Sequence, residues 1–262
     1  PSWLQLGQGR RSVGPPVTMS GELVLVTGAS GYLGSWVCKG FLEAGYRVRG
    51  TVRSLKDARK VAHLRKLVDD GAELELVEAD LLDEGSWPAA CAGCGVVAHV
   101  ASPFIVGVSK SDAEEKLYKP ALNGTLNVLR AAHAAGTVRR VVLTSSTVAI
   151  MGGRRLKSPV LHPEEEWGDV DHADTYGRSK ILAERAAWDF VKEKQDAGES
   201  VFELTTMNPT MIIGPPLGPA WATSHQLTRH ILFREVPCFG DIYMGVVDVR
   251  DVALAHVRAA TA

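Results

Sequence analysis

The chain lacks an excess of charge of either sign and lacks a long apolar run. Its 262 residues carry 29 basic and 30 acidic side chains, so no basic patch for nucleic acid or for an anionic membrane is expected. The longest mostly apolar stretch, residues 96–108, is interrupted by His99 and Ser102 and is too short to span a bilayer. The composition favours a globular enzyme, a monomer or homodimer, with neither nucleic acid nor membrane as a partner.

Cysteine is also scarce, with four residues in the chain. This number is typical of a reducing compartment rather than of a disulfide framework, and we expect a cytoplasmic protein. Cys91 and Cys94 form a C-x-x-C motif, but no second pair and no histidine cluster with ligand spacing accompanies it. We therefore expect two thiols in a surface loop before a strand at Val96, and no metal site.

Residues 1–20 contain no continuous apolar segment and are rich in Gly, Pro and Arg. This composition is not that of a secretory signal. We expect a disordered or extraneous extension here, with the native start at Met19.

What the chain does have is a glycine-rich turn between a short apolar run and an amphipathic segment. The run L-V-L-V-T (23–27) leads into G-A-S-G-Y-L-G, which ends at Gly34. Such glycines permit a tight turn, let the backbone approach a pyrophosphate and let helix and strand pack closely. Free N–H groups at the helix N-terminus attract the anion. The turn stands in the strand–turn–helix context that the motif requires, so the sequence predicts a dinucleotide site.

Apolar strand candidates alternate with helical segments, which is the pattern of a parallel sheet covered on both faces. The expected strands are Leu23–Thr27, Arg47–Val52, Glu73–Glu78, Val96–Ala101, Arg140–Ser145 and Glu203–Asn208, and the expected helices are Leu33–Ala44, Lys56–Asp69, Ala113–Ala135 and Thr175–Lys194. We predict a Rossmann-type doubly wound α/β domain over residues 21–208. Over residues 209–262 the pattern loosens, and we expect a small, incomplete substrate lobe with a helix near Ser224–Arg234.

Tyr176 and Lys180 stand four residues apart, a spacing that places both side chains on one face of a helix. An ammonium beside a phenol lowers the phenol pKa, which lets a tyrosine exchange a proton with a carbonyl oxygen. A hydroxyl is expected at the end of a nearby strand, where Ser145 and Ser146 both qualify. His99, inside an apolar strand, is expected in the core rather than in this site.

The end of the strand at Arg47–Val52 indicates which dinucleotide is bound. NAD-binding units place an acid near this point, whereas a basic residue suits a 2′-phosphate. Here Arg53 follows the strand, and no acid occurs before Asp57. The sequence therefore favours NADPH or NADP+ as the cofactor.

The motifs T-G-A-S-G-Y-L-G, L-T-S-S-T and Y-G-R-S-K together resemble those of the extended short-chain dehydrogenase/reductases. Further runs are similar to the dihydroflavonol reductase and cinnamoyl-CoA reductase group, namely V-R-G-T-V-R-S (48–54), K-V-A-H-L (60–64), V-A-H-V-A-S-P-F (97–104), K-P-A-L-N-G-T (119–125) and V-D-V-R-D-V-A-L-A-H (247–256). The resemblance covers about residues 22–262, with the runs in the family's order.

The resemblance implies hydride transfer from NADPH to the carbonyl of a small-molecule aldehyde or ketone. Tyr176 is then the general acid, and Lys180 holds the nicotinamide ribose and lowers the pKa of Tyr176. Ser146, with Ser145 as the fallback, hydrogen-bonds the carbonyl oxygen. The implied cofactor-binding residues are Thr27, Gly28, Ser30, Gly31, Tyr32, Leu33, Gly34, Arg53, Lys60, Asp80, Leu81, Ala101, Ser102, Tyr176, Lys180 and Pro209.

Two departures from the resembling enzymes leave the substrate open. Met151 stands where flavonoid reductases carry an amide side chain, and residues 172–180 lack the signature of cinnamoyl-CoA reductases. One alternative is an NAD-dependent 3β-hydroxysteroid dehydrogenase or nucleotide-sugar epimerase/dehydratase of the same fold, against which Arg53 argues. A non-catalytic dinucleotide sensor is the other, against which the intact Tyr176 and Lys180 argue.

Overall fold

The computed structural model describes residues 21–68, 73–103, 109, 111–153, 166–219, 222–235 and 245–261. In these ranges six parallel strands form one sheet in the order β3-β2-β1-β4-β5-β6. The strands are β1 (Leu23–Val26), β2 (Arg47–Val52), β3 (Leu74–Glu78), β4 (Val96–His99), β5 (Arg140–Thr144) and β6 (Glu203–Met207). This is the strand order of a Rossmann dinucleotide-binding fold, and the predicted fold class is confirmed.

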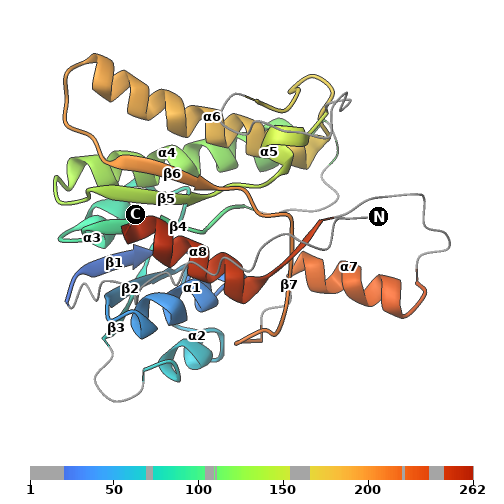
Figure 1. Cartoon of the computed structure of the whole chain (residues 1–262), viewed down its shortest axis with the longest axis horizontal. Helices are drawn as coiled ribbons and strands as arrows, with labels where there is room; N and C mark the ends of the chain where they lie inside the picture. The colour runs from blue at the N-terminus through green and yellow to red at the C-terminus, as the bar shows by residue number, and fades with distance from the viewer. Residues whose placement is uncertain are drawn as a thin grey trace, which may run out of the picture.

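Helices cover both faces of the sheet (Figure 1). One face carries α1 (Tyr32–Glu43), α2 (Ala58–Arg65) and α8 (Val249–Thr261), and the other carries α3 (Trp87–Cys91), α4 (Lys119–Ala134) and α6 (Thr175–Asp196). A 3-10 turn at Glu84–Ser86 precedes α3, and a π-helical turn at Glu114–Tyr118 leads into α4. The short helix α5 (Val148–Met151) follows β5.

The apolar core is divided by the sheet into two clusters. Val24 and Val26 of β1 belong to the cluster under α1, whereas Leu25 belongs to the cluster under α4. This alternation follows from the geometry of a strand, in which successive side chains point to opposite faces. All three side chains are fully buried, as expected for a central parallel strand covered on both sides.

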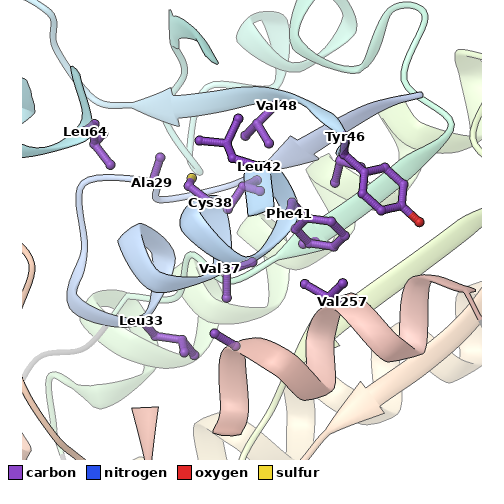
Figure 2. Close-up of a cluster of buried hydrophobic side chains, with 14 of the residues drawn as sticks. Ala29, Leu33, Val37, Cys38, Phe41, Leu42, Tyr46, Val48, Leu64 and Val257 are labelled. Atoms are coloured by element: carbon purple, nitrogen blue, oxygen red, sulfur yellow. The ribbon is translucent and has the colours of Figure 1, made fainter. Parts of the chain in front are cut away.

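The helix α8 lies in the first cluster beside α1. Figure 2 shows Val37 and Phe41 of α1 above Val257 of α8. On the same helix His256 is fully buried, and its Nε2 lies 2.7 Å from the Thr144 hydroxyl at the end of β5. The sequence predicts a partial substrate lobe over residues 209–262, and α8 of this range packs against α1 of the dinucleotide-binding domain. The division of the chain at residue 208 stays a prediction.

A smaller unit connects β6 to α8. It contains a parallel pair of short strands, β7 (Met211–Ile213) and β8 (Val246–Asp248), and the helix α7 (Thr223–Leu232). Two hydrogen bonds fasten this unit to α1, because Tyr32 Oη donates to the Gly214 carbonyl at 3.0 Å and Trp36 Nε1 donates to the Pro215 carbonyl at 2.8 Å. The unit therefore lies against α1, the helix that follows the glycine-rich turn.

Among the described helices, none combines the length and the apolar character that crossing a bilayer requires.

Candidate active site

Three glycines bring the start of α1 against the end of β1. Gly28 has a φ of +68°, and a Cβ there would lie 3.1 Å from Ala101. A Cβ on Gly34 would lie 2.2 Å from the Gly28 carbonyl oxygen, so a larger residue requires the turn to move. Gly31 caps α1 without a side-chain bond, and its Cβ would lie 3.1 Å from the same oxygen. The turn thus presents bare backbone at the N-terminus of a helix, a cradle that a pyrophosphate can approach closely because no side chain stands in the way.

Thr51 of β2 fixes this turn from the neighbouring strand. Its hydroxyl accepts a hydrogen bond from the Gly28 N–H at 3.1 Å, and its carbonyl accepts one from the Ala29 N–H at 2.9 Å. Thr51 is almost fully buried, so both bonds are shielded from water. Thr51 was not predicted as a site residue, because its only signal in the sequence is its place near the end of the strand.

The Thr27 hydroxyl joins the ends of β1 and β4. It accepts from the Ala101 N–H at 2.9 Å and lies 2.8 Å from His99 Nδ1. Burial, followed by the charge of Lys180, lowers the pKa of His99 to about 3, so the ring is neutral at pH 7 and can accept the Thr27 proton. His99 is thus a buried core histidine, as predicted.

Two exposed cations lie at and beyond the end of β2, the strand whose Thr51 fixes the glycine turn. Arg53 directly follows β2, and Lys60 lies on α2. In the part of the chain that the structure describes, neither side chain makes a hydrogen bond or an ion pair, whereas the neighbouring Arg59 is paired with Asp57 at 3.3 Å. Unpaired exposed cations at this position fit the 2′-phosphate of an NADP-type dinucleotide.

Other predicted cofactor residues occupy turns around the same edge of the sheet. Asp80 follows β3 and accepts from the Leu82 N–H at 2.9 Å, and the Leu81 carbonyl accepts from Asn127 of α4 at 2.9 Å. Tyr32 is turned toward Gly214, and burial raises its pKa to about 12. Within the glycine turn, Ser30 is partly exposed, whereas Leu33 lies among the core side chains of Figure 2. Leu33 and Tyr32 can therefore face a ligand mainly through their backbone.

A second group of predicted residues meets where β5 ends beside α6. Asp174 caps α6 by accepting from the Gly177 N–H at 2.6 Å, which sets the first turn of the helix. Tyr176 is hydrogen-bonded to the side chain of Ser146. Lys180 Nζ donates to Ser102 Oγ at 3.1 Å and lies 6.0 Å from the centre of the Tyr176 ring. The structure brings Ser146, Tyr176, Lys180 and Ser102 together.

The two serines after β5 have different surroundings. The Ser146 hydroxyl reaches Tyr176, whereas the buried Ser145 hydroxyl has no hydrogen-bond partner in the described structure. Thr147 donates its N–H to the Pro209 carbonyl at 3.1 Å, so Pro209 lies beside the serine loop. The geometry therefore favours Ser146 over Ser145 as the partner of Tyr176.

Burial shifts the pKa values of Tyr176 and Lys180. It raises the pKa of Tyr176, an effect that the Ser146 hydrogen bond partly opposes. It also lowers the pKa of Lys180 to about 8, against the attraction of Glu184. We expected Lys180 to lower the pKa of Tyr176, and the structure differs because the phenol is desolvated and Lys180 Nζ is bonded to Ser102. Tyr176 therefore holds its proton at neutral pH, as a proton donor must.

Two residues of this group, Glu184 and Asn208, were not predicted from the sequence. The Asn208 amide donates to the Ser146 carbonyl at 3.1 Å and to Glu184 Oε2 at 2.8 Å. Glu184 is only 5% exposed. The available signals were the four-residue spacing from Lys180 to Glu184, which continues the face of Tyr176, and the position of Asn208 at the end of β6.

The C-x-x-C motif lies apart from this site. Cys91 ends α3 and Cys94 follows it, both fully buried and both free thiols. The expected surface loop is therefore wrong, because α3 packs this segment into the cluster under α4. Burial raises the pKa of Cys91 to about 12 and that of Cys94 to about 11, so neither is a reactive thiolate at neutral pH. The described residues contain no group of three or more His, Cys, Asp or Glu that could hold a metal.

The Rossmann sheet and the Ser–Tyr–Lys group at its edge are those of the short-chain dehydrogenase/reductase class. The model of the NAD dependent epimerase/dehydratase family matches residues 24–262, and the chain belongs to this family.

Individual relatives assign the chain to a narrower group within this family. The chain is 42% identical to cinnamoyl-CoA reductase CAD2 of Medicago truncatula over 246 residues, which are 91% of this chain and 72% of the relative. It is 38% identical over 244 residues to the bifunctional dihydroflavonol 4-reductase/flavanone 4-reductase of Malus domestica, covering 90% and 67% of the two chains. The predicted dihydroflavonol reductase and cinnamoyl-CoA reductase group is confirmed.

Solved structures agree with this assignment. Yeast methylglyoxal/isovaleraldehyde reductase Gre2, complexed with NADPH, superposes with a TM-score of 0.77 at 29% identity, over 90% of this chain and 73% of the yeast chain. Vestitone reductase of alfalfa gives a TM-score of 0.70 at 30% identity, over 91% and 72%. The chain spans between two thirds and three quarters of the length of these relatives.

Proposed function

We propose that this chain is an NADPH-dependent oxidoreductase that transfers a hydride to the carbonyl of an aldehyde or ketone. The observation that carries the proposal is the contact of Tyr176 with Ser146 and the neighbouring position of Lys180. Ser146 follows β5 of the same parallel sheet as the glycine turn, and α6 brings Tyr176 and Lys180 beside it; ligands of such folds bind at the carboxyl ends of the strands. NADPH supplies the hydride when it is bound.

The glycine turn and the residues around it hold the cofactor. Gly28, Gly31 and Gly34 let the pyrophosphate approach the start of α1, where N–H groups of the first turn bind it, and Arg53 and Lys60 bind the 2′-phosphate. The remaining contacts that we propose are Thr27, Ser30, Tyr32 and Leu33 around the turn, Asp80 and Leu81 near the adenine, and Ala101, Ser102 and Pro209 along the nicotinamide.

The group of Tyr176, Ser146 and Lys180 carries out the proton transfer. Tyr176 donates its proton to the carbonyl oxygen, which its raised pKa allows because the phenol is protonated at neutral pH. Ser146 orients that phenol and donates a hydrogen bond to the same oxygen, where negative charge develops. Lys180 holds the nicotinamide ribose through its ammonium, which is mostly protonated at pH 7 with a pKa of about 8.

We further propose a cytoplasmic location and a monomeric or homodimeric state. The location is supported by the free thiols of Cys38, Cys91 and Cys94, since an oxidising compartment favours paired cysteines.

The proposal is tested by following the oxidation of NADPH, and in parallel of NADH, with a panel of aliphatic and aromatic aldehydes and ketones. We expect consumption of NADPH with at least one carbonyl and at least tenfold slower consumption of NADH. Consumption of NADH at equal or higher rates would favour the dehydrogenase or epimerase alternative. Tight NADPH binding without turnover of any carbonyl would favour the sensor alternative.

A further inference from the structure

Asn208 uses both protons of one amide to join two elements of the site. One proton goes to the Ser146 carbonyl at 3.1 Å and the other to Glu184 Oε2 at 2.8 Å. An Asn amide has two N–H donors, so the pair of bonds fixes its orientation. The neighbouring backbone bonds, Ser145 N–H to Met207 and Thr147 N–H to Pro209, align the serine loop with the end of β6. The Asn208 side chain holds Ser146, which lies between Ser145 and Thr147.

Glu184 is a buried carboxylate that needs partners. It is only 5% exposed and lies one helical turn beyond Lys180, which is itself 7% exposed. Two buried groups of opposite charge stabilise each other's charged forms, and an unpaired buried charge is costly. The bond from Asn208 satisfies one carboxylate oxygen, and the Lys180 ammonium supplies the opposite charge.

Among the residues that the structure describes, two further ionisable side chains lie near Lys180. Tyr176 lies on the same helix, and His99 approaches from β4. His99 is neutral at pH 7 and Tyr176 keeps its proton, so neither compensates the ammonium. Ser102 contributes an uncharged acceptor. Glu184 is therefore the anion that favours the charged form of Lys180.

We propose that Asn208 and Glu184 form a positioning pair, in which Asn208 holds the Ser146 loop against α6 and Glu184 keeps Lys180 protonated. This inference rests on the proposed function of Ser146 and Lys180. Hydrogen bonds lead from Tyr176 to Ser146, Asn208 and Glu184, and the charge of Glu184 acts on Lys180 one helical turn away on α6. Substitution of Asn208 or Glu184 interrupts this series of interactions without removing a group that touches the substrate.

The charge of Glu184 is tested in the cofactor-free protein. Glu184→Gln keeps the size and an acceptor for Asn208 but removes the negative charge. We expect the pKa of Lys180, followed by a pH titration of its ¹³Cε NMR signal, to fall by about one unit, the scale of a neighbouring charge. Glu193→Gln, an exposed position on the same helix, is the matched control and should leave the titration unchanged. Glu184→Asp retains the charge and should restore most of the shift.

The Asn208 bonds are tested by kinetics. We expect Asn208→Ala to lower kcat about tenfold and to leave the NADPH dissociation constant within about twofold of wild type, because the Ser146 loop rather than the cofactor cradle is released. If Asn208→Ala does not fold, Asn208→Ser is measured instead and should show a smaller loss in the same parameter.

A Lys180 pKa that is unchanged in a folded Glu184→Gln protein would overturn the role of Glu184. An unchanged kcat in Asn208→Ala would overturn that of Asn208. A wild-type protein that reduces no carbonyl would refute the proposed function, and the NMR titration would still decide whether Glu184 sets the charge of Lys180.

Discussion

The two halves of the sheet contribute different chemical groups to the site, backbone in one half and polar side chains in the other. At the ends of β1 and β2 the site consists of backbone, formed by glycines that cannot carry a Cβ, with exposed cations beside it. At the ends of β5 and β6 it consists of polar side chains, of which Ser146, Lys180 and Glu184 are less than a tenth exposed. The first half is therefore sensitive to the addition of one methyl group, and the second to the gain or loss of one proton.

The largest effect is expected in the second half, from Tyr176→Phe. The change keeps the ring and removes the transferable proton, so kcat should fall about 100-fold or more with little change in NADPH affinity. Steady-state kinetics and a fluorescence titration of NADPH measure the two quantities. Tyr46→Phe is the control, because the Tyr46 hydroxyl is buried without a described hydrogen-bond partner on the other side of α1. Near wild-type turnover in Tyr176→Phe would remove the tyrosine from the mechanism.

In the first half the sharpest change is Gly34→Ala. The added Cβ would lie 2.2 Å from the Gly28 carbonyl oxygen, so the turn must move. We expect a loss of about 1–3 kcal/mol in the free energy of unfolding, together with weaker NADPH binding. Gly45→Ala is the control: its φ is +83° but no atom lies within 4 Å of the new Cβ, so it reports backbone strain alone. Equal NADPH affinity in Gly34→Ala and wild type would contradict the cradle.

A smaller effect is expected from Arg53→Ala, which acts on cofactor choice rather than on folding. Loss of one charge-assisted contact to the 2′-phosphate should reduce the ratio of NADPH to NADH affinity about tenfold. Parallel titrations of both cofactors measure the ratio. Arg59→Ala removes a nearby arginine that is paired with Asp57 and should leave the ratio unchanged.

The smallest effect is a pH dependence of the wild-type enzyme. The Lys180 ammonium is present below a pKa of about 8 and is lost above it, so kcat/KM should fall about twofold between pH 7 and pH 8 and more steeply beyond. Because this pKa is lowered from 10.5, the unfolded chain binds more protons between about pH 8 and 10.5, and the contribution of Lys180 to stability rises with pH there. Denaturation of wild type and Lys180→Met across this window checks the sign; an equal pH dependence in both would contradict it.

Sequence patterns predicted the central sheet because each strand carries a local signal. The six strands lie where alternation of apolar runs and helices placed them, and the bounds of β2 agree at both ends. The short strands β7 and β8 were missed, since three residues have no recognisable period and each is paired with a segment far along the chain. The burial of Cys91 was not predicted either, because the cysteine was expected in a surface loop between a helix and the strand at Val96 and instead ends α3.

The contacts of the site were predictable to the extent that they follow from helix and strand geometry. The four-residue spacing brought Tyr176 and Lys180 to one face, and the end of β5 supplied Ser146. The direction of the Tyr176 pKa shift was not predictable, because it depends on how much water the folded chain removes from the phenol. Asn208 was not predictable either, since its two bonds reach to other elements.

The packing of α8 on α1 has a consequence for the synthesis of the chain. Val37 and Phe41 belong to the first helix of the fold, yet the helix that covers them is made about 200 residues later. Until α8 has left the ribosome, this apolar face of α1 has no cover, and contacts of such long sequence separation form slowly. The nascent dinucleotide half is therefore the part of the molecule that a chaperone would protect, and it cannot complete its folding before residues 249–261 are translated.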